Sequence, residues 1–166
     1  RPVMPMMMRG IPAPREKQQY IIADSSREAR ERGVPFGHMV DPFGDPVIRA
    51  FALFPAAVKL DKSLEFVTAY LSAAWAEGID ITTETGLRQV TSAAGIEWNE
   101  LQKAKLGTDW QSDLDDNLAA MNEAGLWGVP SFRVTGGNNT EVFSCWGQDR
   151  IWRVESEISM RAMPDN

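Results

Sequence analysis

The sequence has very little histidine or cysteine: its 166 residues include one histidine, His38, and one cysteine, Cys145. A single cysteine excludes an internal disulfide and a Cys-x-x-Cys pair within these residues, so nothing here requires an oxidising compartment. A lone histidine cannot build a metal site, and we expect no metal and a loop position for His38. We expect Cys145 to be a small buried core residue, because no histidine or second cysteine stands near it in sequence.

The chain also lacks a basic excess and any long apolar run. Lys and Arg number 17 against 23 Asp and Glu, a net charge of -6 that would repel a phosphate backbone. No apolar run approaches the roughly 18 to 20 residues of a membrane span, and the first residues do not resemble a signal peptide. We therefore expect a soluble, cytoplasmic protein that binds neither nucleic acid nor a membrane.

Apolar periodicity predicts helices over most of the chain. A short buried strand is expected over residues 2–8, followed by a proline-rich loop. The helices predicted after it cover residues 16–32, 46–59, 63–78, 83–94, 98–106 and 109–125. Glycines at 33, 78, 95, 107 and 125 end most of these patterns. We expect Ser63 to cap the third helix, and Thr108 or Asp109 to cap the last.

Two of these helices have apolar residues at helical spacing, which predicts their buried faces. In the third predicted helix these residues are Leu64, Val67, Leu71, Ala74 and Trp75. In the last they are Trp110, Leu114, Leu118 and Met121. Three nearby carboxylates, Asp113, Asp115 and Asp116, then belong to the solvent face.

The period changes near the end of the chain. Residues 129–134 are β-prone, 136–139 form a turn, and 140–146 alternate in twos, which together predicts a β-hairpin. Residues 148–161 return to a helical pattern, with Ile151, Val154 and Ile158 expected inward. The order strand, helices, strand, strand, helix indicates an α/β sheet domain with a helical insertion.

Three local motifs occur in order along the chain. They are Lys17-x-x-Tyr20-x-x-x-Asp24-x-x-Arg27 with Gly33-Val34-Pro35 and Asp41-Pro42-Phe43, then Gly128-Val129-Pro130-Ser131-Phe132, then Trp146-Gly147-Gln148-Asp149-Arg150. On these residues the chain resembles the DsbA-like family, in the branch of 2-hydroxychromene-2-carboxylate isomerases and kappa-class glutathione transferases.

The resemblance implies a thioredoxin-like sheet with a helical insertion. Residues 1–45 and 126–166 would form the thioredoxin-like domain, and residues 46–125 the helical insertion. The family's first strand and helix, whose N-terminus carries a reacting serine or a Cys-x-x-Cys pair, would lie upstream of Arg1. The catalytic group would then be outside this sequence.

Each candidate site residue has a structural reading and a binding reading. Pro130 must lie at a strand start, edge or bulge, because proline cannot donate to a ladder. The bond after Val129 could be trans, but the resemblance implies a cis bond and an edge that binds glutathione. Gln148 and Asp149 could simply cap a helix, or hold the γ-glutamyl end of glutathione. Lys17 could be a solvated cation, or reach the glycyl carboxylate of glutathione.

The resemblance implies a glutathione-dependent isomerase or transferase acting on a small aromatic or conjugated acid. A DsbA-like thiol-disulfide oxidoreductase is the alternative enzyme, and a non-catalytic thioredoxin-like binding module is the alternative outside catalysis. A homodimer is an expected assembly, because an open sheet edge favours association.

Overall fold

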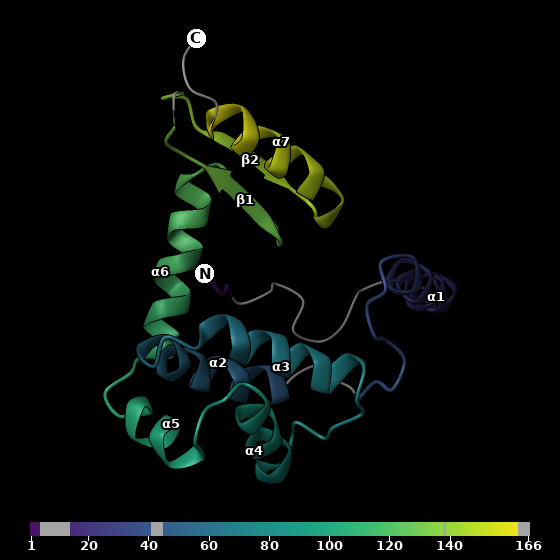
Figure 1. Ribbon diagram of the computed structural model, residues 1–166, viewed down its shortest axis with the longest axis vertical. Coiled ribbons are helices and arrows are strands. Elements are labelled where there is room, and N and C mark those ends of the chain that lie inside the picture. Colours follow the sequence, from purple (N-terminus) through teal and green to yellow (C-terminus); the bar gives the residue numbers. More distant parts are fainter. Residues whose placement is uncertain (4–13, 41–44, 138, 163–166) are drawn as a thin grey trace. The chain divides into compact units, whose positions relative to one another are not determined.

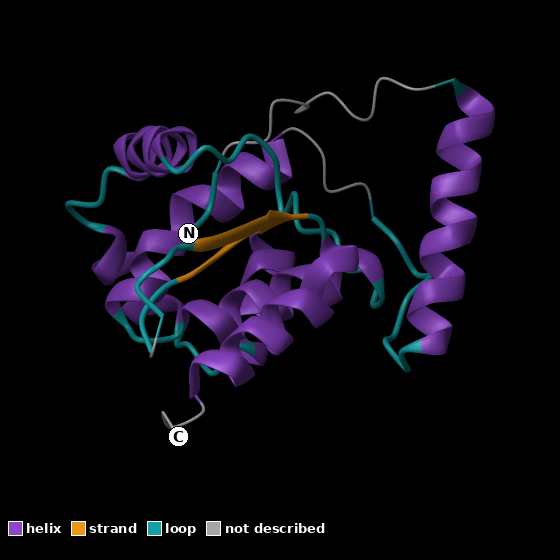
Figure 2. Cartoon of the chain, turned by 90° about the horizontal axis from the view of Figure 1, so that it is seen from above, coloured by secondary structure: helices purple, strands orange, loops and turns teal. Residues whose placement is uncertain are grey.

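The computed structural model describes residues 1–3, 14–40, 45–137 and 139–162, and helices dominate them (Figures 1 and 2). The helices are α1 (Arg15–Glu31), α2 (Asp45–Lys59), α3 (Ser63–Trp75), α4 (Glu84–Ala93), α5 (Trp98–Lys105), α6 (Trp110–Glu123) and α7 (Ile151–Ala162). The strands are β1 (Ser131–Val134) and β2 (Phe143–Trp146), and a 3-10 turn, η1 (Gln148–Arg150), precedes α7. These elements confirm the predicted order of helices and hairpin. Apart from residues 2 and 3, the strand expected over residues 2–8 lies outside the described residues, as does Asp41-Pro42-Phe43.

The chain divides into two compact units. Met6–Asp113 form one, called here the helical unit, and Arg1–Pro5 with Leu114–Asn166 form the other, called the hairpin unit. In the hairpin unit the Asn117 amide donates a hydrogen bond to the carbonyl of Pro2 at 2.8 Å, which ties the start of the chain to α6. The expected domain boundaries at residues 45 and 125 remain a prediction. The two compact units reflect contacts within this chain, and they need not coincide with the thioredoxin-like domain and its helical insertion.

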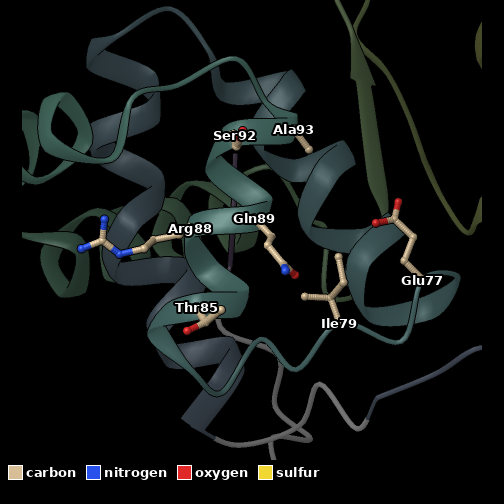
Figure 3. A pocket seen from close by; sticks show the side chains of 7 residues that line it. All are labelled: Glu77, Ile79, Thr85, Arg88, Gln89, Ser92 and Ala93. Carbon is tan, nitrogen blue, oxygen red and sulfur yellow. The ribbon is translucent and has the colours of Figure 1, made fainter.

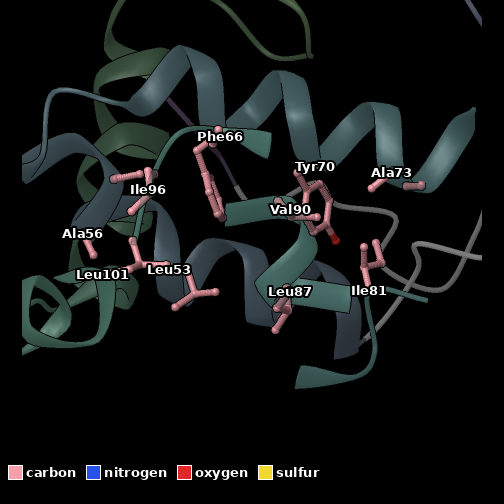
Figure 4. Packing of buried hydrophobic residues seen from close by; sticks show 13 residues of the cluster. Leu53, Ala56, Phe66, Tyr70, Ala73, Ile81, Leu87, Val90, Ile96 and Leu101 are labelled. Atoms are coloured by element: carbon pink, nitrogen blue, oxygen red, sulfur yellow. The ribbon is translucent and has the colours of Figure 1, made fainter. Parts of the chain in front are cut away.

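The helical unit is built around one apolar core. Helix α2 packs against α3 and α5, and α4 packs against α3 and α5. Figure 4 shows the core between these helices, and the largest side chains that it buries completely are Phe66, Ile81, Leu101, Val90 and Thr91. Burial of this kind is the main stabilising contribution to a small domain.

Helix α3 buries a different face from the one predicted. Its buried residues are Phe66, Tyr70, Ala73 and Ala74. Leu64 is 74% exposed and Leu71 48%, so the predicted stripe was wrong except near its end. Both faces of α3 are apolar, and the face with the two aromatic rings removes more surface from water. The predicted cap was also wrong: Lys62 occupies the N-cap position, and Ser63 is the first helical residue.

The hairpin unit contains an antiparallel pair of strands with α7 lying along it (Figure 1). The predicted inward face of α7 was wrong for Ile151 and Ile158, which are about half exposed, whereas Val154 is half-buried. Glu157 and Arg161 are buried instead, joined by an ion pair of 2.7 Å. The Arg161 guanidinium also donates to the carbonyls of Gly136, Asn139 and Glu141. A charged side chain thus fixes the hairpin turn onto α7, which apolar periodicity could not indicate.

Candidate functional site

The five candidate residues fall in both units. Val129, Pro130, Gln148 and Asp149 belong to the hairpin unit, where the strand ends bring them together. Lys17 lies in the first turn of α1 in the helical unit, with an exposed side chain. Lys17 belongs to the other unit, and its role beside the other four residues stays a prediction.

The Val129–Pro130 bond is cis, as the resemblance implied. The carbonyl of Pro130 accepts a hydrogen bond of 3.0 Å from the N–H of Gly147, which joins the start of β1 to the end of β2. Val129 is 52% exposed, and its own N–H and C=O have no hydrogen-bond partner among the described residues. Exposed, unpaired backbone groups at the start of a strand can pair with an extended peptide.

Gly147 leaves room for the Asp149 carboxylate. Its φ of 107° lies in a region that side chains rarely adopt, and a β-carbon there would collide with the Asp149 carboxylate. Asp149 Oδ2 accepts from the Arg150 guanidinium at 2.6 Å, and both side chains are more than half exposed. Gln148 and Asp149 form a 3-10 turn rather than the first residues of the α-helix, which begins at Ile151. The exposed Asp149 carboxylate therefore lies two residues along the chain from Gly147, whose N–H donates to the Pro130 carbonyl.

Two tryptophans beside this edge were not singled out from the sequence. The rings of Trp127 and Trp146 lie 4.6 Å apart between centroids, tilted by 34°, and are 63% and 48% exposed. Gly128 lets them meet, since a β-carbon there would lie 2.9 Å from Trp146 Cδ1. Their position next to the Gly128-Val129-Pro130 and Gly147-Gln148-Asp149 motifs was the available signal.

The helical unit has a separate, widely open hollow of about 660 Å³ between α4 and the segment that follows α3 (Figure 3). Its lining consists of Glu77, Ile79, Thr85, Arg88, Gln89, Ser92 and Ala93. The Arg88 guanidinium is already engaged, by the Glu84 carboxylate at 2.7 Å and by the ring of Trp98 at 4.8 Å. No candidate site residue lines this hollow, and its one arginine is paired within α4.

The remaining ionisable candidates have structural roles. His38 is exposed, and its backbone forms an isolated parallel β-bridge with that of Glu77, in a connection between helices as expected. Cys145 is half-buried in β2, less buried than predicted, because the narrow hairpin has few side chains to cover it. Two hydrogen bonds from Thr82 lower the pKa of Asp80, which fixes the turn before α4. Within the described residues no cluster of three potential metal ligands occurs.

A hairpin opened by a cis proline and closed by a helix, with a helical unit earlier in the chain, defines an α/β thioredoxin-like fold with a helical insertion. The chain belongs to the DSBA-like thioredoxin domain family, whose model matches residues 2–159. No curated protein matches the sequence. Among the described residues, no helix is both long and apolar enough to span a bilayer.

The solved structures that are similar to this chain include two whose names refer to disulfide chemistry. One is the cytosolic disulfide reductase DsbM from Pseudomonas aeruginosa, with 20% identity and a TM-score of 0.62 over 91% of this chain and 80% of that one. The other is a candidate protein disulfide isomerase from Nitrosomonas europaea, with 14% identity and a TM-score of 0.62. The match covers 93% of this chain and 79% of that one. At these identities the similarity establishes the fold.

Proposed function

We propose that this chain belongs to a glutathione-dependent isomerase or transferase of the 2-hydroxychromene-2-carboxylate isomerase type, acting on a small aromatic or conjugated acid. The observation that carries the proposal is the open Val129 edge beside the exposed Asp149 carboxylate. A cytoplasmic location and a homodimer are parts of the same proposal.

The residues at this edge fit the chemistry of glutathione. The N–H and C=O of Val129 offer the donor and acceptor that one residue of an extended tripeptide needs. Asp149 Oδ1 has no hydrogen-bond partner among the described residues, while Oδ2 holds Arg150, so Oδ1 can accept from an ammonium group. Lys17 is proposed for the glycyl carboxylate at the other end.

Glutathione supplies a sulfur nucleophile that adds to a conjugated system and later leaves it. The described residues bind and orient the tripeptide in this proposal, and activation of the sulfur is assigned to none of them. Cys145 has no part in it, because it lies within the β-ladder opposite Phe132. The site therefore contributes affinity and position rather than a proton or a nucleophile.

Glutathione binding to the 166-residue chain tests the proposal by calorimetry. S-methylglutathione should bind, since the contacts are to backbone and carboxylate, and cysteinylglycine, which lacks the γ-glutamyl group, should bind at least about tenfold more weakly. Asp149→Asn should weaken glutathione binding to a similar degree. Glu155→Gln, at an exposed carboxylate on the neighbouring helix, is the matched control and should leave it unchanged.

Equal affinity for glutathione and cysteinylglycine would overturn the proposed site. So would equal effects of Asp149→Asn and Glu155→Gln.

Thiol-disulfide exchange is the second candidate, favoured by what the two similar structures are called. One thiolate can attack a disulfide, but release of the mixed disulfide within the same protein uses a second cysteine, and these residues hold only Cys145. We expect the 166-residue chain not to accelerate reduction of insulin by dithiothreitol. Acceleration that Cys145→Ser removes would favour this candidate over the glutathione-dependent one.

A further inference from the structure

The two faces of the hairpin have different surroundings. The register places Phe132 opposite Cys145 and Val134 opposite Phe143, so these four side chains share one face. All four are half-buried, and the Arg153 guanidinium of α7 lies 5.7 Å from the Phe143 ring centre. This is the face that α7 covers.

The opposite face of the hairpin is left uncovered by the elements that the structure describes, and it carries a tryptophan and an arginine. Ser131 pairs with Trp146 and Arg133 with Ser144, so these side chains lie on the face away from α7. Arg133 and Trp146 are diagonal neighbours in the ladder, roughly 7 to 8 Å apart. Both are exposed, and Trp127 extends the aromatic surface by packing on Trp146.

Arg133 differs from the other arginines around it. Arg150 is paired with Asp149, Arg161 is buried against Glu157, and Arg153 stacks on Phe143 and Trp152. Among the described residues, none forms a hydrogen bond, ion pair or ring contact with the Arg133 guanidinium. Within the described part of the chain, this exposed guanidinium has no carboxylate partner, and a guanidinium in that state can bind an anion.

We infer that this open face binds a flat aromatic carboxylate, whose ring stacks on Trp127 and Trp146 and whose carboxylate pairs with Arg133. The guanidinium fork matches a carboxylate in a bidentate arrangement, and indole rings are the strongest stacking surfaces among side chains. Gly128 preserves the tryptophan pair, because any side chain there would separate the rings. The inference rests on the proposed function in naming where its acid substrate lies, next to the edge assigned to glutathione.

The test is NMR titration of the 166-residue chain with 2-naphthoate, observed at the six indole N–H signals. The signals of Trp127 and Trp146, assigned by Trp127→Phe and Trp146→Phe, should shift, and the exposed Trp152 on α7 should not. The neutral 2-naphthamide should bind about tenfold or more weakly.

Matched variants separate this face from general attraction. Arg133→Gln should weaken 2-naphthoate binding about ten- to a hundredfold, and Arg153→Gln, on the covered face, should not change it. Trp127→Leu should weaken it, and Trp152→Leu should not. Each variant's circular dichroism spectrum checks that the fold is retained.

Equal effects of Arg133→Gln and Arg153→Gln, or shifts centred on Trp152, would overturn the inference. Its failure is distinct from that of the proposed function. If naphthoate binds as described and glutathione does not bind, the inference stands and the glutathione-dependent reaction falls. If glutathione binds and naphthoate does not, the reverse holds.

Discussion

The helical core and the hairpin with α7 bury opposite kinds of side chain. In the helical unit the completely buried residues include Phe66 and Leu101, which meet in one apolar core. On the hairpin and α7 the buried side chains are the charged Glu157 and Arg161, while Trp127, Trp146 and Trp152 remain about half exposed or more. The hairpin unit thus leaves in contact with water the aromatic surface that a core would use.

This difference fits a scaffold in the helical unit and the proposed binding surface on the hairpin. An apolar core stabilises through the area it removes from water, and exposed aromatic rings contribute little to stability in that way. Exposed tryptophans beside unpaired backbone groups and an unpaired arginine are typical of ligand contacts. Substitutions in the helical core should therefore lower the free energy of unfolding, and those around Trp127 should lower the affinity for the proposed aromatic carboxylate.

The largest expected effect is in the helical core. Phe66→Ala should lower the free energy of unfolding by about 3 to 5 kcal/mol, because it removes a buried ring and leaves a cavity. Trp127→Ala, at an exposed ring of similar size, should change it by no more than about 1 kcal/mol. Urea denaturation followed by circular dichroism measures both. Similar losses would mean that Trp127 belongs to a core after all.

The second comparison is between two ion pairs of the same spacing. Arg161→Met should lower stability by about 3 kcal/mol, because it leaves the buried Glu157 charge without a partner and three turn carbonyls without a donor. Arg32→Met breaks the exposed Glu28 pair and should cost less than about 1 kcal/mol. Hydrogen exchange should show the larger loss in the hairpin. Equal losses would show that the Arg161 pair does not hold the turn.

The smallest effect concerns the two tyrosines. Burial raises the pKa of Tyr70 from 10.0 to about 12, whereas Tyr20 is 61% exposed. Between pH 10 and 12 the unfolded chain has released the Tyr70 proton that the folded chain keeps, so the free energy of unfolding falls as pH rises. We expect a loss of about 2 kcal/mol that Tyr70→Phe abolishes and Tyr20→Phe leaves intact. A loss that persists in Tyr70→Phe would assign it to another group.

Much of the fold could be predicted because its signals are local. Helix ends followed the glycines, and the Thr83 hydroxyl accepts from the N–H of Gly86 at the start of α4. Asp109 caps α6 in the same way, by accepting from Ser112. The hairpin followed from alternation around a glycine turn, and the cis bond before Pro130 from the family resemblance. Four of the five candidate site residues then came together through the pairing of β1 with β2.

Sequence by itself determined which segments are helix and strand, since capping, turn chemistry and apolar period act within a few residues. Only the tertiary structure decided which face of each helix is buried, because α3 is apolar on two faces and α7 buries an ion pair. It also decided that Trp127 and Trp146 meet at the surface beside Arg133. That arrangement depends on the pairing register of β1 and β2 and on the space left by Gly128. The alternation of apolar and polar residues along each strand does not specify either one.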